Sequence, residues 1–154
     1  SFESFYAASF DRVYRALAVT VGDVHLAREA TDEAMARAYF RWRQVSAHDN
    51  PSGWVFRVGL NWATSWRRKL RRERVQPDPG RNLPPVEPSD PDGAAVAALA
   101  QLPVGARAVV VCRVLFSMST ADTAAVLQIA EGTVRSRLSR AMATLRTELR
   151  EEQR

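Results

Sequence analysis

The side chains with the clearest chemistry lie in a short segment near the C-terminal end of the sequence. Arginines and hydroxyl side chains recur there along one predicted helix: Thr133, Arg135, Ser136, Arg137, Ser139 and Arg140. A guanidinium group can donate two parallel hydrogen bonds to guanine or to a phosphate, and a hydroxyl can bond to either. The segment therefore predicts contact with nucleic acid. The alternative is an ordinary amphipathic helix with a solvated basic face.

Two short helices with a tight turn between them would position these side chains. Ser119 suits the N-cap of the first helix, 119–127, and Asp122 fits a variant of the capping box. We expect the small side chains of Ala124 and Ala125 to let the helices cross closely. The turn follows at 128–130, and the second helix, from 131 to about 150, has one apolar line: Val134, Leu138, Ala141 and Leu145. This pattern is typical of a helix-turn-helix.

A second basic group ends a longer predicted helix, 51–74. Asn50 suits its N-cap and Pro51 its first position. A run of cations near its end could bind phosphate: Arg67, Arg68, Lys69, Arg71 and Arg72. The apolar line that we expect to be buried is Trp54, Val55, Val58, Trp62, Trp66 and Leu70. The tryptophans could stack on exposed bases, but because they share one helical stripe we expect them mostly in the core.

The rest of the chain contains further helices and one linker. Apolar periodicity predicts a helix over 2–17, with a break at Gly22 and Asp23, and another over 24–42 before a loop at 43–50. The stretch 75–92 holds six prolines, so we expect a semi-extended linker there. Short helices are predicted over 94–102 and 105–116. The sequence thus predicts an all-α fold of two small helical domains, 1–75 and 93–154, joined by a Pro-rich linker, 76–92.

The composition narrows the class of function. The net charge is +5 and comes mostly from arginine, because Lys69 is the sole lysine. This favours a nucleic-acid partner, although an arginine-rich genome would give a solvated basic surface too. The single cysteine, Cys112, is expected to be a small buried apolar residue. The histidines, His25 and His48, are isolated, and we expect no enzyme activity, metal or cofactor. With neither a membrane-length apolar stretch nor a secretory signal, a cytoplasmic protein is expected.

Several of these stretches resemble a known family. The segments 102–111 and 119–127 are similar to the C-terminal domain of RNA polymerase sigma factors. The sequence EGTVRSRLSRA, at 131–141, resembles very closely the recognition helix of the extracytoplasmic-function (ECF) group. In the N-terminal half, 2–17 looks like the opening helix of the family's −10 domain, 22–42 like its polymerase-binding helix and 51–68 like its DNA-facing helix. The resemblance covers nearly the whole chain, in the right order.

The resemblance implies a transcription initiation factor that binds core RNA polymerase, recognises promoter −10 and −35 elements and promotes DNA opening. The residues implied to read duplex −35 DNA are Thr133, Arg135, Ser136, Arg137, Ser139 and Arg140. Those implied to bind the melted −10 strand are His48, Asn50, Arg57, Asn61, Arg67, Arg68, Lys69 and Arg71. Those implied to contact the polymerase clamp are Glu29, Asp32, Glu33, Arg37 and Arg41. The family also implies contact with the polymerase flap, an anti-sigma factor as a partner, no membrane insertion, and association with the nucleoid when active.

One segment departs from the family pattern. The family usually has an acidic-Leu-Val-Gln sequence in its second helix, where this chain has EATD at 29–32. Leu26 and Arg28 also stand where acidic residues are common, and Ser65 replaces a frequent aspartate. These departures keep an alternative open: a sigma-fold DNA-binding regulator that has lost or altered its binding to polymerase.

Overall fold

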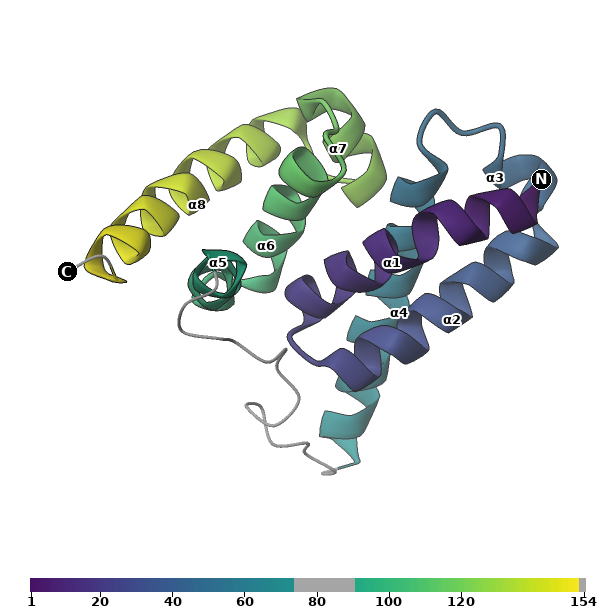
Figure 1. The fold of residues 1–154 in the computed structure, drawn as a ribbon, viewed down its shortest axis with the longest axis horizontal. Coiled ribbons are helices and arrows are strands. Elements are labelled where there is room, and N and C mark those ends of the chain that lie inside the picture. Colours follow the sequence, from purple (N-terminus) through teal and green to yellow (C-terminus); the bar gives the residue numbers. More distant parts are fainter. Residues whose placement is uncertain (74–90, 153–154) are drawn as a thin grey trace. The chain divides into compact units, whose positions relative to one another are not determined.

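The computed structural model of the protein describes residues 1–73 and 91–152, without the side chains of residues 91, 92 and 152. Every regular element in these ranges is a helix, which confirms the predicted all-α fold (Figure 1). The chain divides into two compact units, Ser1–Pro84 and Pro85–Arg154. Most of the predicted linker, 76–92, lies outside the described residues, and its last two residues belong to a helix. None of the helices in the described ranges combines the length and the apolar content needed to cross a membrane.

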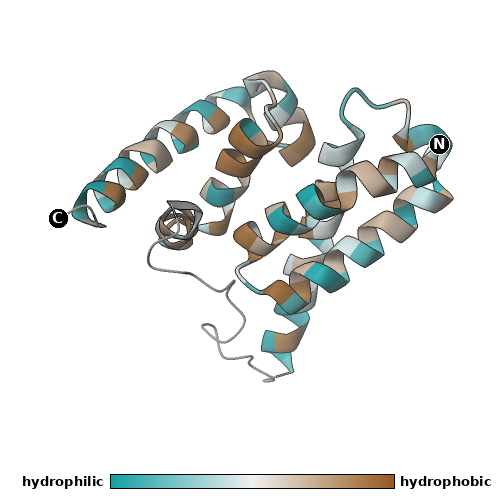
Figure 2. Ribbon diagram, viewed as in Figure 1, coloured by the Kyte–Doolittle hydropathy of each residue, from teal (hydrophilic) through white to brown (hydrophobic). Residues whose placement is uncertain are grey.

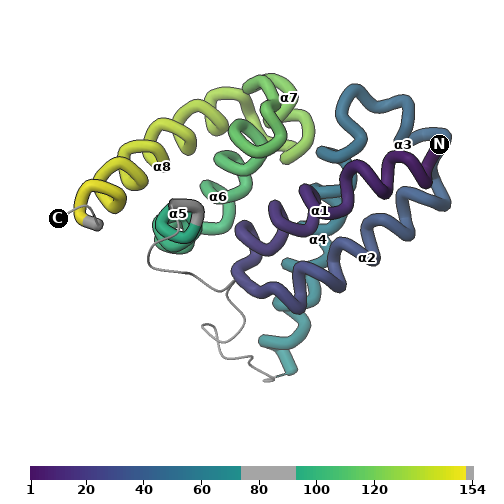
Figure 3. The backbone as a smooth tube through the Cα atoms, in the orientation of Figure 1, coloured from purple at the N-terminus to yellow at the C-terminus, as the bar shows by residue number. Residues whose placement is uncertain are grey.

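Four helices make up the first unit: α1 (Phe2–Val21), α2 (Val24–Phe40), α3 (Trp42–Val45) and α4 (Pro51–Arg72). The side chains of Ser1, Asp23 and Asn50 accept backbone hydrogen bonds at the N-termini of α1, α2 and α4. Gly22 adopts a left-handed conformation with φ 78°, and the chain reverses direction there (Figure 3). The helix α3 is a single turn at the start of the predicted loop, 43–50, and α2 ends two residues earlier than predicted.

The helices α1, α2 and α4 pack against one another, and the buried face of α4 includes the small residues Gly53, Gly59 and Ala63. The prediction that the tryptophan stripe of α4 is buried is wrong. The three tryptophans of this helix are half-buried or exposed, and Trp66 is 37% exposed. The reason is close approach, because Gly59 faces Leu17 and the Ala30 carbonyl, where an indole has no room. The indoles therefore lie on the flanks of the buried face, which consists of Gly53, Val55, Phe56, Gly59, Leu60 and Ala63.

The close packing around Gly59 predicts that a larger residue at this position destabilises the first unit. A Cβ at this position would lie 2.7 Å from Leu17 Cδ1 and 3.3 Å from the Ala30 carbonyl oxygen, and Leu17 is fully buried. We expect Gly59→Ala to lower the free energy of unfolding, because overpacking costs about 1–3 kcal/mol and exceeds the gain of about 1 kcal/mol in helix propensity. Urea unfolding followed by tryptophan fluorescence measures this in the first unit, which contains all four tryptophans.

A matched control lies in the second unit. A Cβ on Gly132 would meet only Arg135 Nη2, at 3.9 Å, which is ordinary van der Waals contact. Gly132→Ala should therefore leave the free energy of unfolding unchanged or raise it by up to about 1 kcal/mol, as followed by circular dichroism. A Gly59→Ala variant as stable as the parent chain would contradict the close packing of α4 on α1.

The described part of the second unit consists of helices and short connections. Its elements are α5 (Pro91–Ala100), α6 (Val104–Val110), the π-helical turn η1 (Val111–Leu115), α7 (Thr120–Leu127) and α8 (Glu131–Glu152). The predicted α-helix over 105–116 is therefore wrong in its second half, which begins at residue 111. The Phe116 amide donates to the Val111 carbonyl five residues back, at 3.1 Å. This register turns Phe116 into the core and leaves Val114 63% exposed.

Two apolar clusters hold the second unit together, and Leu138 of α8 contacts both. One cluster contains the buried residues Leu102, Val110 and Ala141, and the other contains Val109, Ala124 and Val134. In Figure 2 apolar and polar segments alternate along α8, as expected for a helix with one buried side. Cys112 is fully buried, as predicted, and burial raises the pKa of its thiol to about 12.

Candidate nucleic-acid and polymerase-binding surfaces

Helices α7 and α8 form the predicted helix-turn-helix, with residues 128–130 as the turn. The Ser119 hydroxyl accepts a hydrogen bond from the Asp122 amide at 3.0 Å, so the predicted N-cap is confirmed. Of the two alanines expected to permit close crossing, Ala124 is buried, but Ala125 is exposed. The Ile129 amide donates to the Ala124 carbonyl at 3.1 Å and so closes the turn. The motif fixes the direction in which α8 leaves the turn.

The outer face of α8 presents most of the residues predicted to read DNA. Thr133 is half-buried, whereas four others are exposed: Arg135, Ser136, Ser139 and Arg140. Arg140 Nε donates to the Ser136 carbonyl at 3.3 Å, which holds the guanidinium along the helix. Arg137 differs from these four, because it is half-buried and its Nη1 would lie 3.0 Å from a Cβ on Gly105 of α6. Arg137 therefore has a packing role in addition to any contact with DNA.

The backbone conformation of the turn predicts that glycine at position 128 stabilises the second unit. Gln128 adopts φ 57° and ψ 47°, a left-handed conformation that is strained for residues with a Cβ. We expect Gln128→Gly to stabilise the second unit by about 0.5–1 kcal/mol, as measured by thermal unfolding at the helical circular dichroism band. The control is Gln101→Gly, because Gln101 is also exposed but has no positive φ. That change should destabilise the unit, and equal effects of both substitutions would contradict the assigned strain.

A second basic surface lies at the C-terminal end of α4. Four of its cations are exposed: Arg68, Lys69, Arg71 and Arg72. Arg67 is half-buried, and burial lowers the pKa of its guanidinium, while the Asp23 carboxylate raises that pKa and Arg71 lowers it further. Since Asp23 also caps α2, Arg67 links the end of α4 to the start of α2 electrostatically. The four exposed cations are better placed to meet phosphate than Arg67 is.

Two tryptophans of α4 form a stack beside this basic surface. The indoles of Trp62 and Trp66 are nearly parallel, with an interplanar angle of 2° and centroids 6.0 Å apart. The Lys69 ammonium lies 5.5 Å from the centroid of the Trp66 ring, as a cation–π contact. A base that stacks on Trp66 would therefore compete with Lys69 and Trp62 for the surface of this indole.

The residues predicted to line the −10 pocket lie in different environments. His48 and Asn61 are exposed. Asn50 accepts a hydrogen bond from the Gly53 amide at 2.9 Å, so its side-chain oxygen serves as the N-cap of α4. Arg57 is half-buried, and its buried Nε has no hydrogen-bond partner among the described residues. Because a buried donor without a partner is costly, Arg57 is the member of this group whose environment most favours a ligand.

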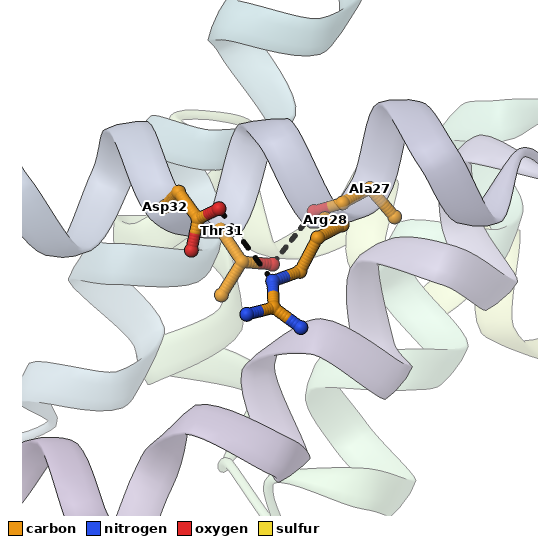
Figure 4. A network of polar contacts seen from close by, with 4 residues as sticks. All are labelled: Ala27, Arg28, Thr31 and Asp32. Carbon is orange, nitrogen blue, oxygen red and sulfur yellow. Dashed lines mark hydrogen bonds and ion pairs between the residues drawn. The ribbon is translucent and has the colours of Figure 1, made fainter.

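The exposed face of α2 carries charged residues that pair within the helix. Arg37 Nε donates to Glu33 Oε1 at 3.1 Å, and Arg28 Nε lies 3.5 Å from Asp32 Oδ2. Figure 4 shows the Arg28 and Asp32 pair, with Thr31 hydrogen-bonded back to the Ala27 carbonyl on the same helix. The other residues predicted to meet polymerase, Glu29 and Arg41, are exposed as well. This face is polar, solvent-accessible and close to charge balance.

Comparison with known proteins supplies the decisive observation. Residues 93–145 match the family described as sigma-70, region 4. The RNA polymerase sigma-E factor of Streptomyces coelicolor is 34% identical, over 96% of this chain and 85% of its own. The ECF RNA polymerase sigma factor SigL of Mycobacterium tuberculosis is 35% identical, over 84% of this chain and 78% of its own.

The chain belongs to the ECF RNA polymerase sigma factors. The resemblance drawn from the sequence is therefore confirmed. A solved structure agrees in fold: the sigma factor RpoE of Bartonella quintana, in complex with the anti-sigma factor NepR, has a TM-score of 0.80 at 22% identity, over 97% of this chain and 96% of that one.

The sigma factor has one prominent surface residue that sequence reasoning missed. Phe40, the last residue of α2, is 83% exposed and lines a hollow together with Arg41, Arg43 and Gln44. The signal was present in the sequence. The apolar line of α2 runs through Ala27, Ala30, Ala34 and Ala38 and does not include position 40. An aromatic residue that lies outside the apolar line of its helix is expected at the surface.

Proposed function

We propose that this sigma factor binds core RNA polymerase, recognises promoter −10 and −35 elements and promotes opening of the duplex. The observation that carries the proposal is the pair of basic helix surfaces, one on α4 of the first unit and one on α8 of the second, in a member of the sigma-factor family. The domains that we propose are 1–75 for −10 recognition and polymerase binding and 93–154 for −35 recognition, with 76–92 as the linker. The protein acts through binding, without a catalytic site or cofactor of its own.

The second unit reads the −35 element as duplex DNA. In a helix-turn-helix the N-terminal part of the second helix meets base edges in the major groove. Arg135 is exposed near the start of α8, and its guanidinium can bind guanine through two hydrogen bonds. Arg140 and Arg137 lie further along the helix and are assigned to phosphate, whereas Thr133, Ser136 and Ser139 supply hydroxyls to base or backbone.

The first unit binds the melted −10 strand. Arg68, Lys69 and Arg71 supply phosphate contacts from the exposed end of α4. Arg67 contributes mainly through the long-range field of its charge, because it is half-buried. The pocket for an unpaired base is assigned to the 43–50 loop and the adjoining face of α4, with these side chains: His48, Asn50, Arg57 and Asn61.

The α2 surface contacts the polymerase clamp through Glu29, Asp32, Glu33, Arg37 and Arg41. Contact with the polymerase flap is assigned to the second unit. The protein is expected in the cytoplasm, and at the nucleoid when it is active. An anti-sigma factor is a further proposed partner, supported by the NepR complex of the similar RpoE fold.

The test uses an exposed charge pair. The Glu33→Ala, Arg37→Ala double variant should bind core polymerase about tenfold more weakly, because interface truncations of this kind cost about 1–2 kcal/mol. The fold should stay intact, since exposed pairs contribute about 0.3–0.5 kcal/mol to stability. Asp11→Ala, Arg15→Ala is the matched control, with the same charges four residues apart on the exposed side of α1. Binding is measured by fluorescence anisotropy of the labelled full chain, and unchanged affinity in the Glu33/Arg37 variant would remove the assignment of this surface.

One observation favours a second function, a sigma-fold DNA-binding regulator with lost or altered polymerase binding. Arg28 stands where the family often has an acidic residue, so the charge of this position is reversed. Its guanidinium pairs with Asp32 and lies 4.8 Å from the centroid of the Phe10 ring. A regulator of this kind would bind promoter DNA but would not stimulate transcription by core polymerase.

A further inference from the structure

The Phe40 ring is displayed to solvent at the bend between α2 and α3. It is 83% exposed, and its ring contact among the described residues is an edge contact with Tyr39, with centroids 5.6 Å apart. Most of the ring surface is thus accessible to a flat ligand. A single exposed apolar side chain is ordinary on a protein surface, so the surroundings of Phe40 decide whether it forms a site.

The neighbours of Phe40 in sequence are anchored on α1. The Tyr39 ring meets Phe2 edge-on, with centroids 5.3 Å apart, and the Trp42 ring lies 5.5 Å from Phe2 and 5.0 Å from Phe5. Because residues 39 and 42 are held on α1, the residues between them must project from the outside of the bend. The backbone that carries Phe40 is therefore anchored, so a ligand does not have to order this bend of the chain when it binds.

The hollow beside the ring is positively charged. Its lining residues are Phe40, Arg41, Arg43 and Gln44. The exposed guanidinium groups of Arg41 and Arg43 form no ion pair with any residue in 1–73 or 91–152. The nearest acidic side chain along α2, Glu33, is already paired with Arg37. The ligand that matches this hollow has a flat ring and negative charge close to it.

We propose that Phe40 is the stacking platform for one unpaired base of single-stranded DNA. Arg43 binds a phosphate that flanks this base, and Arg41, which lies at the end of the surface assigned to the clamp, binds the other. The Gln44 amide, which can donate and accept, bonds to the base edge. The proposal rests on the proposed function, because it names a specific contact of the melted strand. A protein partner is the other occupant to consider, but two unpaired cations beside an exposed aromatic ring match a nucleotide better than an apolar side chain.

The experiment measures binding of the full chain to two oligonucleotides with the same number of phosphates: a short oligothymidine and its abasic counterpart. Phe40→Ala should weaken oligothymidine binding about tenfold or more and leave abasic binding unchanged, whereas Phe40→Trp should retain the parent affinity. Arg41→Gln and Arg43→Gln should each reduce the salt slope of binding to both probes by about 0.7. The control is Val114→Ala, which removes another exposed apolar side chain, and it should change neither affinity.

Equal effects of Phe40→Ala on both probes, or no effect on either, would overturn the stacking site. Loss of affinity for core polymerase in Phe40→Ala, with oligothymidine binding unchanged, would assign the ring to a protein partner instead. Run-off transcription with the parent chain is measured separately. If the parent chain supports no transcription while Phe40→Ala still loses oligothymidine binding selectively, the proposed function fails and the stacking site stands.

Discussion

Replacing Arg68 and Arg71 by glutamine should weaken binding of single-stranded DNA by one to two orders of magnitude at about 50 mM salt, with the slope of log K against log salt reduced by about 1.4. The physical reason is counterion release, because each phosphate neutralised on a single strand contributes about 0.7 to that slope. Both residues are exposed on the last turns of α4, so the fold should be unaffected. Anisotropy titrations of the full chain at several salt concentrations measure both quantities.

The matched control is Arg12→Gln, Arg15→Gln, which removes two exposed arginines with the same spacing from α1. This variant has the same net charge as the α4 variant, and we expect its salt slope to stay near that of the parent chain. Equal loss of slope in the two variants would mean that binding depends on the net charge of the protein. In that case the α4 surface would lose its assigned role.

Arg135→Ala should reduce selectivity among duplex DNA sequences by about 5- to 150-fold at one base pair of the preferred site. A bidentate contact between arginine and guanine contributes about 1–3 kcal/mol of discrimination, and the exposed side chain is near the start of α8. The preferred site is obtained first by selecting bound duplexes from a random pool with the parent chain. Competition between that site and its single-base substitutions then measures selectivity.

The control for this prediction lies on the same helix. Arg146 is exposed about three turns further along α8 and is assigned to phosphate. Arg146→Ala should weaken binding to all duplexes alike and reduce the salt slope by about 0.9. If Arg135→Ala also weakened all sequences alike, α8 would bind the backbone without reading bases.

Much of the fold follows from local signals in the sequence. Asn50 and Ser119 were predicted as N-caps because their side chains accept amide hydrogen bonds, and the structure has both bonds. The structure differs from the prediction where packing between distant parts of the chain determines which residues are buried. Which stripe of α4 is buried depends on the fit of Gly59 against α1 and α2, and periodicity alone could not choose between that stripe and the neighbouring indoles. The π-helical turn before Phe116 likewise depends on which apolar side chain the core accepts.

The candidate site shows the same division. Exposure of Arg135 and Arg140 follows from their place opposite the apolar line of α8, and the sequence predicted it. Arg137 and Arg67 also have structural roles, and these roles depend on contacts between helices. Arg137 packs on Gly105, and Arg67 interacts electrostatically with Asp23. Such contacts are invisible in the spacing of one helix, so site residues predicted from a basic run include members with structural roles.

Run-off transcription shows whether the chain initiates transcription at specific promoters. Core RNA polymerase from a Streptomyces host is mixed with the full chain and with duplex templates that carry the selected sites. We expect transcripts with one defined start that depend on the added chain and that decrease in the Glu33→Ala, Arg37→Ala variant. Specific DNA binding without any transcript above core polymerase alone would contradict the proposed function and identify the chain as a DNA-binding regulator with a sigma-factor fold.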